Sequence, residues 1–213
     1  LGGYDGGLLR RADDLGRRLS NAFRDPTRNQ RRTLTGIPFG AVSLKTGVNM
    51  TETKIASTAG ATTLLLEMGT LARLTNNSTL EQLATKAVQA IWSRRAQKTG
   101  LVGAHIDIET GRWTHQDAGI GSGIDSYYEY LLKGQVLLGA DDLSPVFKQS
   151  YFAVEKHLRM NPWYVELNMH TGMLVWPIFN ALQAFWPGMQ TLMAACGSDH
   201  EAFRKGRFEA LGE

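Results

Sequence analysis

The chain lacks several features that often reveal what a protein does. Its 213 residues contain one cysteine, Cys196, so no internal disulfide bond can form and no metal site built on several cysteines exists. No apolar run approaches the ~18 residues that a transmembrane helix needs. The first residues also lack the charged and then apolar pattern of a signal peptide.

Several catalytic and binding motifs are missing too. The sequence contains no G-x-x-x-x-G-K-[ST], H-E-x-x-H, G-x-S-x-G or EF-hand pattern. Its five histidines never stand at the i, i+4 spacing of a helical metal pair, so we interpret each of them as a hydrogen-bonded loop residue. The net charge of +3 is scattered, and the run from Arg28 to Arg32 is typical of a solvated loop. We therefore predict no nucleic-acid partner.

Helical periodicity is the most abundant signal. Apolar stripes predict helices over residues 8–23, 64–74, 78–91, 125–138, a fifth from Ser144-Pro145, and a sixth from about Pro177 that Pro187-Gly188 should break. The first stripe consists of Leu8, Ala12, Leu15, Leu19 and Phe23. Two extended pieces, 101–108 and 163–169, are each followed by turn residues and predict hairpins. We expect paired helices with short hairpin insertions.

The most informative segment runs from Trp113 to Lys133. Gly119, Gly121 and Gly123 allow a sharp backbone bend, and Asp125 follows at the start of an aromatic helix. This arrangement suits a carboxylate at the floor of a pocket. Asp125, Ser122 or Ser126 could instead be an ordinary helix cap, with the tyrosines that follow forming core.

Several blocks, in order along residues 4–192, carry a resemblance. They are Tyr4-Asp-Gly-Gly-Leu-Leu9, Thr35-Gly-Ile-Pro-Phe39, Ser57-Thr-Ala-Gly60 with Leu64-Leu-Leu-Glu-Met68, Gly100-Leu-Val-Gly103 with His105-Ile-Asp107, Trp113 to Lys133, and Leu182-Gln-Ala-Phe-Trp-Pro-Gly188. The chain resembles glycosyl hydrolase family 47, the class I α-mannosidases, and within it the ER degradation-enhancing α-mannosidase-like proteins. Residues 1–213 would be a partial catalytic domain that diverges after about residue 193.

The resemblance implies an all-α fold, part of an (α/α)7 barrel of which about three helical hairpins with short β-hairpin insertions are present. It implies Ca²⁺ as cofactor and the removal of α-1,2-linked mannose, with inversion, from high-mannose N-glycans of misfolded glycoproteins. The location would be the endoplasmic reticulum lumen, and an ER oxidoreductase would be a further partner. Asn49, Asn76 and Asn77 stand in N-x-[ST] patterns and are glycosylation candidates there.

Asp125 matches the family's catalytic aspartate before Ser-Tyr-Tyr-Glu-Tyr. We predict Glu67, Glu129 and Trp186 as substrate-binding residues, although Glu129 suits a structural role equally well and an aromatic ring such as Trp186 could equally be core. The family's Phe-Glu-x-x-Ile-Arg, Arg-Pro-Glu and Thr-Glu segments are absent, and with them two glutamates and the calcium threonine, so we expect no metal ligand here. We therefore expect an internal, inactive fragment of a mannosidase. The alternative is a non-catalytic protein that binds glycans or misfolded clients.

Overall fold

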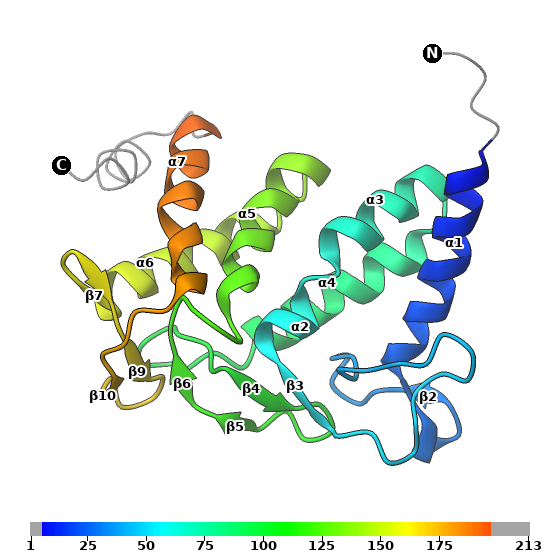
Figure 1. Cartoon of the computed structure of the whole chain (residues 1–213), viewed down its shortest axis with the longest axis horizontal. Helices are drawn as coiled ribbons and strands as arrows, with labels where there is room; N and C mark the ends of the chain where they lie inside the picture. Colours follow the sequence, from blue (N-terminus) through cyan, green and yellow to red (C-terminus); the bar gives the residue numbers. More distant parts are fainter. Residues whose placement is uncertain (1–5, 197–213) are drawn as a thin grey trace. The chain divides into compact units, whose positions relative to one another are not determined.

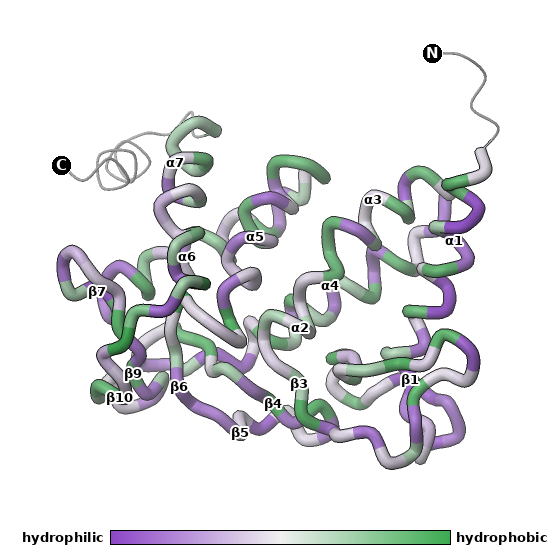
Figure 2. Tube along the Cα trace, in the orientation of Figure 1, coloured by the Kyte–Doolittle hydropathy of each residue, from purple (hydrophilic) through white to green (hydrophobic). Residues whose placement is uncertain are grey.

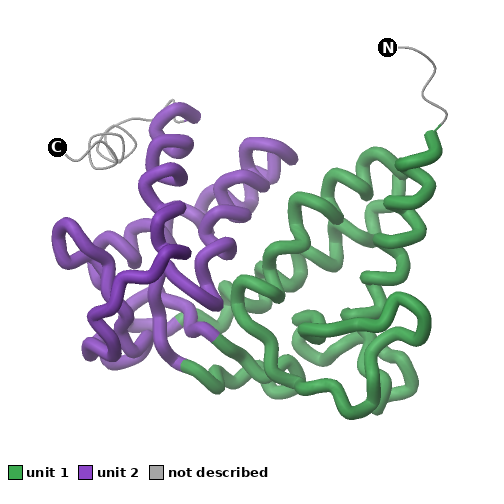
Figure 3. The backbone as a smooth tube through the Cα atoms, viewed as in Figure 1, with its two compact units in different colours: residues 1–95, 105–115 green, residues 96–104, 116–213 purple. Residues whose placement is uncertain are grey.

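The computed structural model describes residues 6–196. They divide into two units (Figure 3). Unit 1 consists of residues 1–95 and 105–115, and unit 2 of residues 96–104 and 116–213. The divergent segment predicted after about residue 193 lies mostly outside the described residues.

The described residues of unit 1 contain four α-helices (Figure 1). They are α1 (Gly7–Leu19), α2 (Thr58–Thr62), α3 (Leu65–Thr75) and α4 (Ser78–Trp92). Helix α3 packs on α4, and the chain reverses between them at Asn76, which adopts a left-handed conformation with φ of 54°. Asparagine tolerates this conformation better than most residues, so the two helices form a tight hairpin. Helix α1 packs on α3, and α2 on α4.

Short elements link these helices. A 3₁₀ turn η1 (Ser20–Phe23) follows α1, and strands β1 (Arg24–Asp25) and β2 (Arg31–Arg32) pair across a second 3₁₀ turn, η2 (Pro26–Arg28). A three-stranded antiparallel sheet has the order β3 (Ile55–Ser57), β4 (His105–Asp107), β5 (Trp113–His115). Asp107 accepts the backbone N–H groups of Glu109 and Thr110 at 2.8 Å, which closes the β4–β5 turn. The hairpin predicted here is confirmed.

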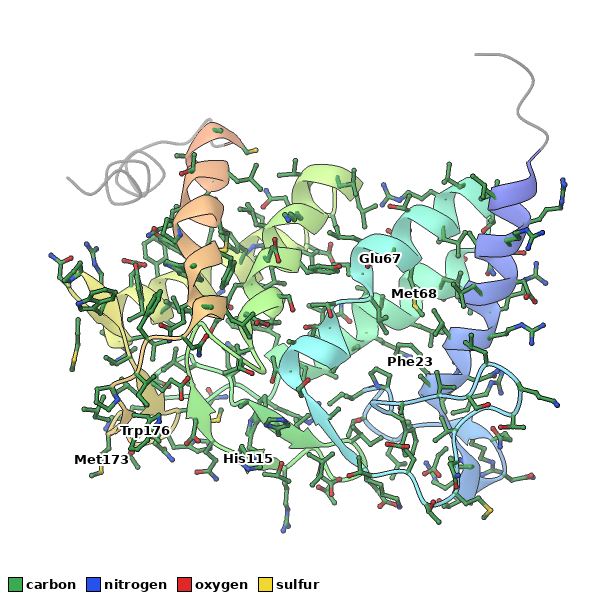
Figure 4. All side chains as sticks on the ribbon, in the orientation of Figure 1. Phe23, Glu67, Met68, His115, Met173 and Trp176 are labelled. Carbon is green, nitrogen blue, oxygen red and sulfur yellow. The ribbon has the colours of Figure 1, made fainter. Side chains whose placement is uncertain are left out.

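The core of unit 1 lies between these helices and the sheet, where Phe23, Met68, Ile91 and Ile106 are buried. Figure 4 labels Phe23 and Met68. The prediction that Leu8 and Leu15 face this core is wrong, because 75% of Leu8 and 44% of Leu15 is exposed. Gly16 is instead the buried residue of α1. Figure 2 shows the apolar positions that α1 and α3 carry.

Unit 2 contains helices α5 (Asp125–Leu138), α6 (Leu143–His157) and α7 (Trp186–Cys196), with a 3₁₀ turn η3 (Ala181–Phe185) before α7. Helix α5 forms a hairpin with α6, and α7 packs on α5. Gly139, with φ of 59°, ends α5 in the left-handed conformation that glycine adopts without steric cost. The second helical hairpin is therefore built like the first.

Five short strands complete unit 2. Strands β6 (Asp117–Ala118), β9 (Glu166–Asn168) and β10 (Leu174–Trp176) form an antiparallel sheet of order β10-β9-β6. Strands β7 (Arg159–Met160) and β8 (Trp163–Tyr164) pair as a separate hairpin. The hairpin predicted from residues 163–169 and the turn at 170–172 is confirmed, because β9 and β10 pair on either side of that turn.

Three expected helix boundaries are wrong. The first helix, expected to reach residue 23, ends at Leu19, and the 3₁₀ turn η1 follows it. The sixth helix does not begin at about Pro177: Asn180 caps the 3₁₀ turn η3 by accepting the Leu182 N–H at 2.9 Å, and α7 begins at Trp186. Pro187 therefore lies in the first turn of α7, where its missing N–H breaks no helical hydrogen bond. The fifth helix likewise begins at Leu143, one residue before Ser144.

Candidate functional site

The glycine-rich bend leads directly into helix α5. The carbonyl oxygen of Gly121 accepts the N–H groups of Asp125 at 2.9 Å and of Ile124 at 3.2 Å. Gly123 has φ of 86°, a backbone conformation that side chains disfavour. Asp125 is thus placed in the first helical turn by backbone hydrogen bonds from the bend itself.

The carboxylate of Asp125 is half-buried and bonded locally. Its Oδ1 accepts the backbone N–H of Ser126 at 2.7 Å and the Ser126 hydroxyl at 3.3 Å. Among the residues that the structure describes, the N-cap position of α5 is Ile124, and no side chain caps this helix. The simple capping interpretation of Asp125, Ser122 and Ser126 is therefore wrong.

Polar side chains line both sides of the bend. A Cβ on Gly119 would lie 2.9 Å from Cγ of Glu166, on strand β9. A Cβ on Gly121 would lie 2.7 Å from Nδ2 of Asn180 and 3.2 Å from Cγ of Gln183. At Gly119 a Cβ would meet the middle of the Glu166 side chain, so the backbone or the strand would have to shift; at Gly121 the atom that it would meet first is the end of the Asn180 side chain. The bend is thus in van der Waals contact with a carboxyl-bearing side chain and with two amide-bearing ones.

The sequence analysis did not identify Glu166 or Gln183 as residues of the candidate site. Burial raises the pKa of the Glu166 carboxyl above its ordinary value, and the nearby Asp117 raises it further. Gln183 is 3% exposed, and neither atom of its amide has a hydrogen-bond partner among the described residues. The sequence offers only one signal for Gln183, its place in the Leu-Gln-Ala-Phe block. Nothing in the sequence distinguishes Glu166, because its burial depends on the packing of β9 against the bend.

Trp186 lies in the aromatic core that supports α5. Its side chain is 0% exposed, and its ring contacts Tyr128, Tyr151 and Tyr164 at centroid distances of 5.4, 5.7 and 5.7 Å. The prediction that Trp186 binds substrate is therefore corrected: a fully enclosed indole offers no face to a sugar ring. Because Tyr128 stands one turn after Asp125, this cluster fixes the helix that carries the carboxylate.

A buried glutamine, Gln190, is hydrogen-bonded to two tyrosines of this aromatic cluster. Gln190, 3% exposed, donates from Nε2 to the hydroxyls of Tyr151 at 3.2 Å and Tyr164 at 3.4 Å. The Tyr164 hydroxyl donates to Glu155 at 2.7 Å. Burial, followed by the interaction with Glu155, raises the pKa of Tyr164, so the phenol stays protonated. This buried glutamine therefore has partners within the chain, unlike Gln183.

The remaining predicted carboxylates lie elsewhere. Glu129, one turn after Asp125, forms an ion pair with Lys133, and both side chains are partly exposed. Glu67 belongs to unit 1, on α3 (Figure 4), and lines a groove of about 570 Å³ between α1 and α3. Most of that lining is apolar: Leu9, Ala12, Leu15, Leu19, Leu64, Leu66, Met68, Leu71 and Leu74. Asp125, Glu129 and Trp186 belong to unit 2, Glu67 to unit 1.

The sequons lie at or near the surface. Asn49 is exposed and its Oδ1 accepts the backbone N–H and the hydroxyl of Thr51, both at 3.0 Å. Asn76 is exposed at the end of α3, and the half-buried Asn77 follows it. Within residues 6–196, no three His, Cys, Asp or Glu side chains come together as a metal site. No helix in the same range is both long and apolar enough to cross a bilayer.

Comparisons with known proteins agree on one family. The profile of glycosyl hydrolase family 47 matches residues 1–209. Alpha-mannosidase I MNS4 of Arabidopsis thaliana is 50% identical over 189 residues, which are 89% of this chain and 29% of that protein. ER degradation-enhancing alpha-mannosidase-like protein 2 of Homo sapiens is 42% identical over 188 residues, covering 88% of this chain and 31% of that protein.

A solved structure has the same fold. The alpha-1,2-mannosidase from Trichoderma reesei superposes with a TM-score of 0.78 at 22% identity, over 93% of this chain and 41% of that one. The helical hairpins described above are therefore part of an α/α barrel, as the resemblance implied. The chain spans about a third of the length of the curated relatives named above. On its sequence and its fold together, this chain belongs to glycosyl hydrolase family 47.

Proposed function

We propose that this chain is part of an inverting α-1,2-mannosidase that trims high-mannose N-glycans, with Asp125 as one of its catalytic carboxylates. Family membership supports the reaction class, and one relative over 70% of this chain is named mannosyl-oligosaccharide 1,2-alpha-mannosidase. The observation that carries the proposal is the Gly121 carbonyl, whose two hydrogen bonds set Asp125 at the start of α5.

An inverting glycosidase needs two carboxyl groups. One protonates the leaving oxygen and the other activates water on the opposite face of the sugar, and they stand about 6.5–9.5 Å apart. Asp125 supplies one of these groups in the proposal, and its bond to the Ser126 N–H holds the carboxylate in one orientation. The second group belongs to the rest of the enzyme, because the family's two glutamate segments are absent from this sequence.

Calcium, the ER lumen and protein partners belong to the same proposal. Several relatives are named ER degradation-enhancing alpha-mannosidase-like proteins, and these names support a role in degradation at the endoplasmic reticulum. The proposal adds misfolded glycoproteins as substrates, Asn49, Asn76 and Asn77 as glycosylation sites, and an oxidoreductase as a partner. Within the described part of the chain no three His, Cys, Asp or Glu side chains come together, and the proposal places the ligands of the ion in the rest of the enzyme.

The test is mannose release from an α-1,2-linked high-mannose glycan by the longer protein that carries this chain. We expect Asp125→Asn to abolish release while leaving thermal stability near that of wild type. Asp141→Asn, which changes an exposed carboxylate outside the bend, is the matched control and should leave release unchanged. Glycan binding without any release by the wild type would instead establish the non-catalytic alternative.

A further inference from the structure

A groove in unit 1 plays no part in the proposed reaction. It is lined by strand β2 and helix α4 and has a volume of about 500 Å³, within the ordinary range for ligand sites. All of its lining residues belong to unit 1, so the groove is complete within one unit. Apart from one leucine the lining is polar: Arg32, Thr79, Glu81, Gln82, Leu83, Thr85, Lys86 and Gln89.

The groove carries positive charge without a counter-charge. Arg32 and Lys86 are exposed, and neither forms an ion pair with another residue that the structure describes. The one carboxylate of the lining, that of Glu81, is already paired with Arg73 at 2.8 Å. Both cations are therefore available to an anionic partner.

A second arginine makes the charge at Arg32 less favourable. Arg24 of β1 lies directly opposite Arg32 in antiparallel register, and like charges in such positions destabilise a sheet. The only acidic residue of this hairpin, Asp25, is buried, and its carboxylate accepts the N–H and the hydroxyl of Thr27 at 2.9 and 2.6 Å. Partial burial, followed by the charge of Arg24, lowers the pKa of Arg32. An anion in the groove would offset this repulsion.

The groove is long rather than point-like. Exposed side chains at positions 79, 82, 86 and 89 are three or four residues apart, so they follow one face of α4. Residues 79–89 span about 15 Å along the helix axis, a length that about four or five residues of extended peptide would cover. A single small anion would contact only part of this row.

The chemistry of the row also suits a peptide. Threonine and glutamine side chains both donate and accept hydrogen bonds, so Thr79, Gln82 and Gln89 can bond the N–H and C=O groups of an extended backbone. Arginine and lysine form charge-assisted hydrogen bonds with carboxylates. A nucleic-acid strand fits less well, because the lining contains no aromatic ring on which a base could stack.

We propose that this groove binds an acidic, extended segment of a partner protein, with Arg32 and Lys86 pairing with its carboxylates. The interaction surface belongs to unit 1, whereas Asp125 belongs to unit 2. The inference therefore does not rest on the proposed reaction, and its test is a binding measurement that requires no mannose release.

Arg31 provides a matched control. It is an exposed arginine next to Arg32 on the same strand, but it does not line the groove. Successive side chains of a strand point to opposite faces, which explains the difference. Arg31→Gln and Arg32→Gln thus remove the same charge, one outside the groove and one inside it. Attraction by net charge alone would respond equally to both.

The experiment measures binding of a fluorescein-labelled peptide of eight alternating Asp and Glu residues to the longer protein that carries this chain, by fluorescence anisotropy at low salt. Arg32→Gln and Lys86→Gln should each weaken binding about fivefold, the upper end for an exposed ion pair. The double variant should weaken it about twentyfold, and Arg32→Lys should recover part of the single loss. Arg31→Gln should leave the affinity near that of wild type. A peptide of alternating Asn and Gln should not bind.

Several results would overturn the proposal. One is the absence of binding to the acidic peptide by the wild type, and another is an equal loss in Arg31→Gln and Arg32→Gln. Displacement of the peptide by an equal concentration of inorganic phosphate would indicate a small-anion site instead. An equal affinity for an oligothymidylate of the same charge would indicate a nonspecific cationic surface. Melting temperatures should stay near that of wild type, and a marked fall in Arg32→Gln or Lys86→Gln would show that the two cations serve the fold rather than a partner.

Discussion

Trp186 stacks on Tyr151, with ring centroids 5.7 Å apart and planes inclined by only 11°. The pair joins α7 to α6, and the edge of Trp186 also meets Tyr128 of α5 at 5.4 Å. One indole therefore links all three helices of unit 2. Its contribution is packing, and the consequences of its removal can be measured directly.

Replacing Trp186 by leucine should destabilise the protein strongly. A fully buried aromatic side chain removed from a core costs about 3–5 kcal/mol when truncated to alanine, and leucine fills only part of the cavity. We expect a loss of about 2–4 kcal/mol in denaturant unfolding. Trp176→Leu, at a position that is 58% exposed, should change stability far less. Similar losses for both would show that the aromatic cluster does not support the fold.

Adding a methyl group at Gly119 should impair activity by displacing the bend. The new Cβ would lie 2.9 Å from Cγ of Glu166, in the middle of a side chain anchored on β9, so the backbone or the strand has to shift. We expect Gly119→Ala to reduce mannose release at least tenfold. Gly188→Ala, where no atom lies within 4 Å of the added carbon, is the control. Full activity of Gly119→Ala would show that the bend does not position Asp125.

Glu166 should make stability depend on pH in the direction opposite to most carboxylates. Its pKa in the folded chain is raised above 4.5 by burial and by Asp117, so the fold favours the protonated form. The associated stability is present below pH 4.5 and is lost as the pH rises through the raised pKa. We expect Glu166→Gln to melt at a higher temperature than wild type at pH 7 and to lose that advantage at pH 4. An advantage that is the same at both pH values would contradict this origin.

His105 should contribute an acid sensitivity to unit 1. It faces Ser57 of β3 and His115 of β5 in the sheet, with the two imidazole centroids 4.8 Å apart. Burial and then the charge of His115 lower its pKa below 6.5, so the unfolded chain takes up the proton first. Stability is thus complete above pH 6.5 and falls as the pH drops from there through the lowered pKa.

His105→Gln should therefore flatten the dependence of melting temperature on pH between about 7 and 5. His170→Gln, at an exposed position in the β9–β10 turn, should leave the slope as it is in wild type. The contribution of His105 would be refuted by equal slopes in wild type and His105→Gln.

The groove between α1 and α3 should bind an apolar dye. Leu15 is 44% and Leu74 64% exposed, and exposed apolar surface of this extent is typical of an interaction site or an aggregation-prone face. We expect Leu15→Gln with Leu74→Gln to lower dye fluorescence and self-association of the 213-residue chain without lowering its melting temperature. Leu80→Gln, at a position that is 2% exposed, should unfold it instead. Unchanged dye binding in the double variant would place the exposed apolar surface elsewhere.

Periodicity predicted the helices well where the helix buries its own stripe. Residues 78–91 and 125–138 are helical almost to the residue. Their apolar side chains are buried inside the unit to which each helix belongs, as Leu80 and Ile91 are in unit 1 and Leu131 is in unit 2. Periodicity did not predict which face of α1 is buried, because an apolar stripe does not show which neighbouring element covers it. The stripe containing Leu8 and Leu15 lies exposed for that reason.

The candidate site was predictable only in part. The glycine-rich bend and the family motif both point to Asp125, which remains a prediction. The positions of Glu166 and Gln183 depend on contacts between β9, η3 and the bend, 47 and 62 residues after Gly119 and Gly121 in the sequence, and no local pattern encodes them. Trp186 shows the reverse problem, since an aromatic residue beside a loop has the same sequence signature whether it stacks on a sugar or on a tyrosine.

The shared carbonyl of Gly121 has a mechanical consequence. Because one oxygen anchors the amides of both Ile124 and Asp125, the loop and the first helical turn cannot tilt independently without breaking a hydrogen bond. A displacement of the bend would therefore carry the carboxylate of Asp125 with it, so that the loop and the first turn of α5 move as one piece.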